Sequence, residues 1–286
     1  MSQAGSLLES LPKPIGFVLG GGGSLGAQQV GQLQALGDAG IYADLVVGTS
    51  IGSVNGAVVA ADPIGAASRL SHQWRDMDPD SLMGKGWLNR IAQMFRRTNS
   101  VLDTPQVAQL IAEQLGDIDI SELALPYAAM AVDVEEGRPV RLGSGRLVSA
   151  IEASTAVPGA FPMINRGGRL LCDGGIITNV GVLDALEMGA KSLVVMDCMF
   201  AGHTMDVPKG VINVFMWAFM IQLRQQVLRD LPIAAESMPV LYLPGAKPIG
   251  GTIFEFDQTG YLISDAYDRS RTFLDTVAVD GPGLYS

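Results

Sequence analysis

The chain has 286 residues, of which 48% are hydrophobic and 17% charged, which is ample for a large core in one α/β domain. The 19 Lys and Arg residues against 29 Asp and Glu residues give a net charge of −10, which argues against nucleic acid as the main partner. The two cysteines, Cys172 and Cys198, are too few for a disulfide framework and favour a reducing compartment.

The sequence shows neither a secretory signal nor a membrane span. Residues 1–14 lack a basic start followed by an apolar core, and no apolar run approaches the roughly 18 residues of a membrane span. We therefore expect a cytoplasmic protein. Two proline residues suggest that 1–14 is a loose segment, followed by a single domain over 15–275 and a tail over 276–286.

A glycine-rich stretch, Gly20–Gly26, follows the first predicted strand, Ile15–Leu19, and precedes a helix over 27–36. It satisfies the Gly-x-Gly-x-x-Gly pattern through Gly21, Gly23 and Gly26. A dinucleotide-binding module is therefore one interpretation. The other is a run of unobstructed backbone N–H groups that face an oxyanion. Asp44 precedes the second strand, whereas a dinucleotide site needs an acid at its end, so the oxyanion interpretation is favoured.

The second predicted strand, 45–47, runs into a sharp turn that reads Gly-x-Ser-x-Gly from Gly48 to Gly52. Small and apolar residues over 51–61 then predict a helix. Strand, turn and helix form the setting of a nucleophile elbow, in which the hydroxyl of Ser50 projects from a strained turn. This turn has no room for β-carbons at the two flanking positions, and glycine has none. The N-terminus of the helix would favour negative charge near the serine.

Predicted strands and helices alternate along the rest of the chain. Strands are expected at 127–132, 140–142, 170–172, 193–196 and 240–243, and helices at 63–76, 101–115, 147–153, 182–188, 211–228 and 259–274. This alternation predicts a mostly parallel sheet covered on both faces, with ligand chemistry at the carboxyl ends of its strands. The glycine-rich stretch, Ser50, Asp173 and Asp197 are all expected at such ends.

A serine hydroxyl is a weak nucleophile until a base accepts its proton. The chain has two histidines, of which His72 lies among polar residues of a predicted helix. His203 could complete a triad with Ser50 and either Asp173 or Asp197, as in an α/β-hydrolase. The elbow comes after only one strand, which suits that fold poorly.

The alternative base is Asp173 acting directly on the serine. Asp173 ends a predicted strand, and Gly174 and Gly175 leave room for a close approach. An aspartate is a weak base because its reference pKa is about 3.9, but burial would raise that pKa. Cys172 is interpreted as a small buried hydrophobic residue, and no Cys/His cluster has metal-binding spacing.

Two segments suggest contact with lipid. Residues 81–102 hold four basic residues and no acid, with apolar residues at helical spacing, so they form either a surface helix or a lid or interfacial segment for anionic lipid surfaces. Met and aromatic residues later in the chain either pack in the core or line an acyl groove. These are Met199, Met205, Phe215, Met216, Trp217, Phe219 and Met220.

Three motifs in this chain order resemble the patatin-like phospholipase family: Gly21–Gly26, Gly48–Gly52 and Asp173–Gly175. The stretches 153–162 and 254–257 are also similar to that family, so the resemblance covers about residues 15–275. It implies a three-layer α/β/α sandwich with a mostly parallel sheet. It also implies a Ser–Asp dyad that hydrolyses phospholipids, lysophospholipids or simpler esters without a metal or cofactor, with peripheral membrane contact as a further hypothesis.

By position in these motifs, Ser50 would be the nucleophile and Asp173 the general base. The backbone amides around Gly22, Gly23 and Ser24 would form the oxyanion hole, in a loop that also contains Gly21 and Gly26. Two positions depart from the family pattern. Leu25 replaces the usual Arg or Lys, and Gly181 stands where proline is frequent. Stabilisation by backbone N–H groups should survive the first change, whereas help with an anionic head group should not.

Overall fold

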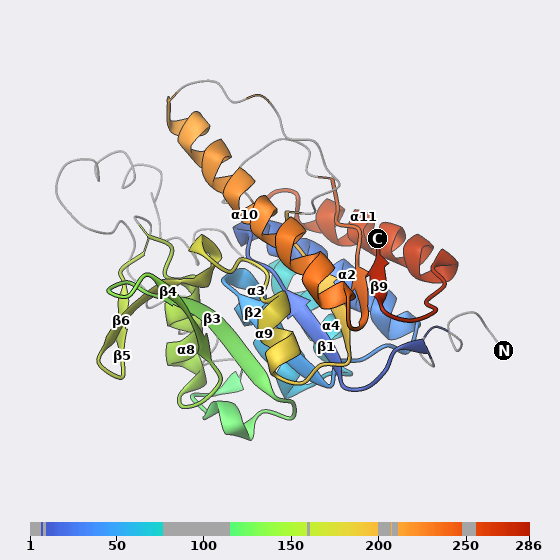
Figure 1. The fold of residues 1–286 in the computed structure, drawn as a ribbon, viewed down its shortest axis with the longest axis horizontal. Helices are drawn as coiled ribbons and strands as arrows, with labels where there is room; N and C mark the ends of the chain where they lie inside the picture. Colours follow the sequence, from blue (N-terminus) through green and yellow to red (C-terminus); the bar gives the residue numbers. More distant parts are fainter. Residues whose placement is uncertain are drawn as a thin grey trace.

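The computed structural model describes residues 7, 10–76, 115–158, 161–199, 207, 211–247 and 256–286. The predicted segment 81–102 and all but the last residue of the predicted helix 101–115 lie outside this part of the chain. The described residues form a nine-stranded sheet with helices on both of its faces (Figure 1).

The strands are β1 (Ile15–Leu19), β2 (Leu45–Thr49), β3 (Tyr127–Asp133), β4 (Arg138–Leu142), β5 (Ile164–Arg166), β6 (Arg169–Asp173), β7 (Ser192–Met196), β8 (Pro239–Tyr242) and β9 (Gly283–Tyr285). Their order in the sheet is β5-β6-β3-β2-β1-β7-β8-β9, with β4 paired to β3 outside this path. Along the path β3-β2-β1-β7-β8-β9, every strand runs parallel to its neighbours. The remaining pairs are antiparallel: β4 with β3, β6 with β3, and β5 with β6. The prediction of a mostly parallel sheet is therefore confirmed.

The helices are α2 (Ala27–Asp38), α3 (Ile51–Ala61), α4 (Ala66–Asp76), α8 (Leu147–Thr155), α9 (Val182–Glu187), α10 (Val211–Ala235) and α11 (Thr259–Thr276). Short 3-10 helices are η1 (Gly23–Gly26), η2 (Ile120–Glu122) and η3 (Gly174–Ile176). Figure 1 shows α10 running diagonally across the sheet, next to α9.

Two hydrophobic clusters separate the helices into two layers. Because successive side chains of a strand point to opposite faces, Phe17 and Leu19 of β1 join one cluster and Val18 joins the other. The first cluster packs α2, α3, α4, α8 and α11 against the sheet, and the second packs α9 and α10. Strands buried on both faces need apolar residues throughout, which explains the runs in β1, β2 and β7. The predicted three-layer α/β/α sandwich is confirmed.

The strand that carries Asp173 runs against its neighbour. β6 is antiparallel to β3, and Asp173 ends β6, as expected from the sequence. The register explains why Asp173 still reaches the same place. Asp173 lies opposite Ala131 of β3, while Thr49 at the end of β2 lies opposite Met130. Asp173 and the residue that follows Thr49 are therefore at the same height on either side of β3.

Both ends of the described chain contribute to the fold. Leu7 and Leu11 are buried in the first cluster, and the Ser192 hydroxyl donates a hydrogen bond to the carbonyl oxygen of Pro12 at 2.8 Å. At the other end, β9 lies within the segment predicted as a tail and adds a parallel edge strand to β8. The packed unit therefore extends beyond the predicted limits of 15 and 275.

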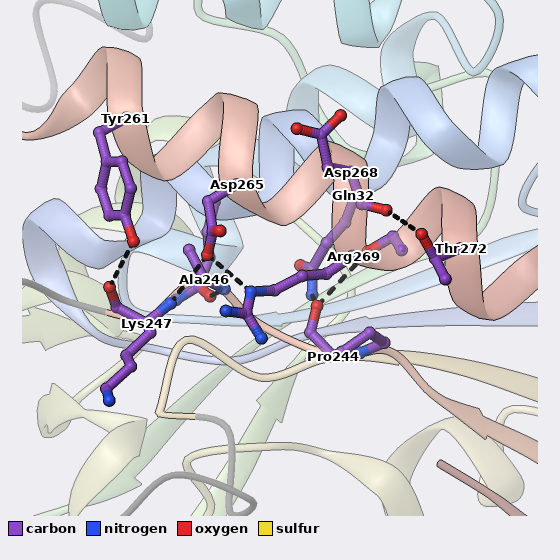
Figure 2. A network of polar contacts seen from close by, with 11 residues as sticks. Gln32, Pro244, Ala246, Lys247, Tyr261, Asp265, Asp268, Arg269 and Thr272 are labelled. Atoms are coloured by element: carbon purple, nitrogen blue, oxygen red, sulfur yellow. Dashed lines mark hydrogen bonds and ion pairs between the residues drawn. The ribbon is translucent and has the colours of Figure 1, made fainter.

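The loop after β8 is tied to α2 and α11 by polar contacts (Figure 2). The amide of Lys247 donates to Asp265 at 3.1 Å, and the hydroxyl of Tyr261 donates to the carbonyl oxygen of Lys247 at 3.1 Å. From α2, the side-chain amide of Gln32 donates to the carbonyl oxygen of Pro244 at 3.3 Å. These contacts fix the loop at the carboxyl edge of the sheet, where the loop after β1 also emerges.

Gly31 lies at a close backbone contact between α2 and α11. A β-carbon there would overlap the carbonyl oxygen of Ile263 and lie 2.8 Å from the amide nitrogen of Tyr267. We expect Gly31→Ala to lower the free energy of unfolding by roughly 1–3 kcal/mol, because the two helices must separate. Gly37→Ala, in the same helix, meets no atom within 4 Å and should raise that free energy by up to about 1 kcal/mol. Urea unfolding measures both changes, and equal stabilities of the two variants would contradict this packing.

Candidate active site

Ser50 has a left-handed backbone, with φ 52° and ψ −127°, and is the one non-glycine residue with positive φ in the part of the chain described. It lies between β2 and α3, at the N-cap position of α3. Such a conformation costs on the order of 1–3 kcal/mol and persists only where the surroundings enforce it. It matches the strained turn of a nucleophile elbow, and the serine is partly exposed.

Two neighbouring serines hold this turn. The amide of Ser50 donates to the hydroxyl oxygen of Ser154 at 3.0 Å, and that hydroxyl donates onward to the carbonyl oxygen of Met130 at 2.6 Å. The carbonyl oxygen of Ser50 accepts from the amide of Ser53 at 2.8 Å and from its hydroxyl at 2.6 Å. Both polar groups of the strained peptide are therefore satisfied, and neither depends on the Ser50 hydroxyl.

The glycines of the turn allow a close approach of backbone to backbone. A β-carbon at Gly52 would overlap the carbonyl oxygen of Leu19 at the end of β1. A β-carbon at Gly48 would overlap the carbonyl oxygen of Gly52. Only residues without a side chain fit at these two positions, so α3 can begin directly against the sheet.

Asp173 is buried, with 4% of its surface exposed, and lies at the end of β6. Its Oδ1 accepts a hydrogen bond from the amide of Gly175 at 2.7 Å. Its Oδ2 is buried and has no hydrogen-bond partner of normal geometry among the described residues. Burial raises the pKa of Asp173 to about 6, and this rise is opposed by hydrogen bonding from Ser50 and from the amide of Gly175. The Ser50 hydroxyl is therefore near enough to influence the carboxyl group.

The glycines after Asp173 leave no room for larger residues. A β-carbon at Gly174 would overlap the carbonyl oxygen of Met130, and one at Gly175 would lie 3.0 Å from Oδ1 of Asp173. The turn can therefore fold tightly against β3, and the amide of Gly175 can donate to the carboxylate of Asp173.

The glycine-rich stretch lies directly against Ser50. A β-carbon at Gly21 would be 3.0 Å from Cβ of Ser50. The amide of Gly20 donates to the carbonyl oxygen of Met196 at 3.0 Å, and that of Gly21 donates to Asn179 at 3.2 Å. Within the described part of the chain, the amides of Gly22 and Gly23 donate to no backbone oxygen.

The five glycine-loop residues named from the sequence therefore divide by contact. The amide of Gly21 is engaged, and a β-carbon at Gly26 would lie 2.7 Å from the Ile51 side chain, so both residues serve the packing of the loop. Ser24 is buried within η1. Gly22 and Gly23 are the residues of this set for which no backbone acceptor of the amide is found in the described chain.

A buried polar network beneath the loop was missed from the sequence. The side-chain amide of Gln29 donates to the carbonyl oxygens of Gly20 at 2.9 Å and of Met196 at 3.1 Å. Asn55 donates to Gln29 at 2.8 Å and to the carbonyl oxygen of Gly26 at 3.1 Å, and accepts from the Trp74 indole at 3.0 Å. The signal in the sequence was a polar residue within an otherwise apolar helix, since a buried amide needs a hydrogen-bond partner.

Both cysteines are buried. Burial raises the pKa of the Cys172 thiol to about 11, and burial also raises the pKa of Cys198 well above its ordinary value. The thiol of Cys198 donates to the carbonyl oxygen of Gly20 at 3.3 Å. Protonated, desolvated thiols of this kind are poor nucleophiles.

The residues on which the alternative interpretations depend lie elsewhere or are engaged. Asp44, at the start of β2, accepts from the amide of Ile15 at 2.8 Å and pairs with Lys13 at 3.2 Å, at the edge of the sheet opposite the glycine loop. Asp197 accepts from the amide of Met199 at 2.9 Å and from the Tyr242 hydroxyl at 2.8 Å.

Several predicted features fall outside the described residues. His203 and Met205 do so entirely, while the side chains of Phe215, Met216 and Phe219 are not described. Met199, Trp217 and Met220 are partly exposed. His72 lies on α4 and is exposed. The triad, the acyl groove and the lid formed by 81–102 therefore stay predictions.

No group of three or more His, Cys, Asp or Glu residues in the described part of the chain could hold a metal ion. None of the helices in that part of the chain is both long enough and apolar enough to cross a bilayer.

The raised pKa of Asp173 makes stability depend on pH. Its ordinary pKa is 3.8 and its folded value is about 6, so between these values the unfolded chain has lost a proton that the folded protein keeps. Wild type should therefore lose stability, relative to Asp173→Asn, as the pH rises from about 4 to about 6, by a total of roughly 3 kcal/mol. Urea unfolding below and above this window measures the loss, with Asp268→Asn, an exposed carboxyl on α11, as the control. A difference between wild type and Asp173→Asn that is independent of pH would contradict the prediction.

Comparisons with known proteins identify related chains. A lysophospholipase (nte1) of Aspergillus oryzae is 32% identical over 192 residues, which cover 65% of this chain and 12% of the relative. Patatin-like phospholipase domain-containing protein 7 of Rattus norvegicus is 33% identical over 186 residues, which cover 64% of this chain and 13% of the relative. The matched region is thus a small part of these longer proteins.

Solved structures were compared with this chain as well. VipD from Legionella pneumophila matches with a TM-score of 0.47 and 13% identity, covering 93% of this chain and 67% of that chain. The family model described as patatin-like phospholipase matches residues 17–186. Since this match includes all three motifs and more than half of the chain, the protein belongs to the patatin-like phospholipase family.

Proposed function

We propose that this protein is a lipid acyl hydrolase that cleaves carboxylic esters through an acyl-serine intermediate on Ser50, with Asp173 as the general base. The observation that carries the proposal is the buried Oδ2 of Asp173, which lacks a hydrogen-bond partner of normal geometry among the described residues while the Ser50 hydroxyl is near enough to affect the carboxyl group. A buried carboxylate oxygen is a strong acceptor, because no water competes for it.

The first half of the reaction transfers the acyl group to the protein. The hydroxyl oxygen of Ser50 attacks the ester carbonyl carbon while its proton passes to Asp173. The carbonyl oxygen becomes an oxyanion, which the amides of Gly22 and Gly23 stabilise. One such donor is typically worth about 2.7–4 kcal/mol. As the carbon–oxygen bond of the ester breaks, Asp173 returns the proton to the departing alcohol or lysolipid.

The second half releases the acid. A water molecule attacks the acyl group on Ser50, Asp173 accepts one proton from that water, and the same oxyanion site is used. Asp173 then returns its proton to the serine oxygen as the acyl bond breaks. A base with a pKa of about 6 suits both halves, because about 90% of it is ionised at pH 7 and it is still far more basic than an ordinary aspartate.

The substrate class follows from the relatives and from one departure in the loop. Relatives that share 28–33% identity are named lysophospholipase, neuropathy target esterase and patatin-like phospholipase domain-containing protein. We therefore place phospholipids and lysophospholipids first among the substrates, at a membrane surface that the protein contacts peripherally. Leu25 is partly exposed and packs against the core, so the loop brings no cation to the head group at this position.

A labelling experiment tests the nucleophile. A fluorophosphonate should label wild type on Ser50, and Ser50→Ala should lose both the label and hydrolysis of a panel of acyl esters and lysophospholipids. Ser144→Ala, which removes an exposed serine far from the elbow, should keep both. Binding of a nicotinamide cofactor without labelling would instead support a dinucleotide-binding module.

The pH profile tests the base. The value of kcat/KM should rise as the pH increases through about 6, because the ionised carboxylate of Asp173 is the active form. Asp173→Asn should lower kcat by at least about 10²-fold and remove this rise.

The variant His203→Ala separates a Ser–Asp dyad from a triad that includes the histidine. A severe loss of turnover there would count against a direct Ser–Asp pair.

A further inference from the structure

Asn179 lies between the glycine loop and the turn after Asp173. It is buried, with 3% of its surface exposed. A β-carbon at Gly21 would lie 2.7 Å from its Oδ1, and one at Gly175 would lie 3.1 Å from the same atom. The preceding residue touches the elbow, because the hydroxyl of Thr49 donates to the carbonyl oxygen of Thr178 at 3.0 Å. This short segment therefore meets all three motifs of the site.

Asn179 binds both polar groups of one glycine. The amide of Gly21 donates to its main-chain carbonyl oxygen at 3.2 Å, and its side-chain Nδ2 donates to the carbonyl oxygen of Gly21 at 3.4 Å. A glycine has no side chain to restrain its peptide planes, so their orientation depends on such contacts.

The geometry of the peptide bond transmits this restraint to Gly22. The carbonyl of Gly21 and the N–H of Gly22 belong to one planar trans peptide, in which the two groups point in opposite directions. While Asn179 holds the carbonyl, the N–H of Gly22 must point away from Asn179. Likewise, the carbonyl oxygen of Gly22 accepts from the amide of Leu25 at 3.2 Å, which sets the direction of the Gly23 N–H. Rotation of the Gly21–Gly22 peptide would put a carbonyl oxygen where a donor is needed.

The residue after Asn179, Val180, is held by α10. Gln226 on α10 donates to the carbonyl oxygen of Val180 at 3.1 Å and accepts from its amide at 3.3 Å. Its side-chain amide also donates to Asp230 at 2.6 Å, which fixes the glutamine. The backbone next to Asn179 is therefore clamped on both of its polar groups.

We infer that Asn179 is a positioning residue that keeps the Gly21–Gly22 peptide in the orientation that directs the N–H of Gly22 toward the oxyanion. The inference rests on the proposed function. Asn179 touches neither the substrate nor the reacting atoms; it acts through Gly21. Loss of the Asn179 side chain should raise the free energy of the transition state, in which the oxyanion exists. Binding of the intact ester should be nearly unchanged.

The test compares Asn179→Ala with Asn165→Ala, an exposed asparagine on β5 that serves as the matched control. We expect Asn179→Ala to lower kcat by roughly 10- to 100-fold, with KM changing less than about threefold, because part of one oxyanion donor is lost. Asn179→Asp keeps the size of the side chain but replaces the Nδ2 donor, so it should not restore kcat. Wild-type turnover in Asn179→Ala or in Asn179→Asp would overturn the inference.

A transition-state analogue gives a second measurement. When Ser50 adds to a trifluoromethyl ketone, a bond forms between the serine oxygen and the ketone carbon, the serine proton passes to Asp173, and the ketone oxygen becomes an oxyanion. Asn179→Ala should bind this ketone more weakly by the same factor as its loss in kcat/KM, and bind the fatty-acid product as wild type does. Wild-type affinity for the ketone would contradict the inference.

Experiments on the wild-type protein cover two further cases: a variant that does not fold, and a protein without the proposed activity. Should Asn179→Ala fail to fold, a crystal structure of wild type with the ketone on Ser50 replaces it. An oxyanion within about 3.1 Å of the Gly22 nitrogen, with Asn179 still on the Gly21 carbonyl, supports the inference, and an oxyanion bound by other groups overturns it. If wild type neither hydrolyses esters nor reacts with fluorophosphonate, the proposed function has failed and the inference falls with it.

Discussion

The site depends on the left-handed backbone of Ser50. A non-glycine residue adopts φ 52° only under constraint, and here the constraint comes from one contact distant in sequence and one nearby. Ser154 on α8 holds the amide of Ser50, and Ser53 on α3 holds its carbonyl. The glycines at 48 and 52 let those elements approach. As a result, the hydroxyl is the one polar group of Ser50 that remains uncommitted to the turn.

Burial and incomplete hydrogen bonding act together on Asp173. One carboxyl oxygen accepts from Gly175, while Oδ2 is enclosed without a partner of normal geometry in the described part of the protein. A second strong donor would stabilise the carboxylate and lower its pKa, which would weaken it as a base. The fold instead excludes water and keeps the pKa near 6, at some expense in stability. The same desolvation thus links the proposed chemistry to the predicted pH dependence of unfolding.

Several buried amide side chains support the site in the same way. Gln29, Asn55 and Asn179 each donate to a carbonyl oxygen of the glycine-rich stretch. Since the N–H and C=O of one peptide point in opposite directions, fixing the carbonyls beneath the loop turns its amides toward the other side. Two of these residues lie on α2 and α3, which also form the core, so orientation of the loop and stability of the domain share the same contacts.

Local pattern determined much of this protein from the sequence alone. Apolar strands, a glycine loop, the elbow at Ser50 and Asp173 with its glycines are read within a few residues, because periodicity and turn geometry are local properties. Tertiary structure decided what depends on distant contacts: the antiparallel direction of β6, the edge strand β9, and the hydrogen bonds of Ser154 and Asn179. It also decided which amides of the loop are engaged, because a hydrogen bond to Asn179 from Gly21 joins residues 158 positions apart. No local pattern encodes such a pairing; only the packed sheet brings its two partners together.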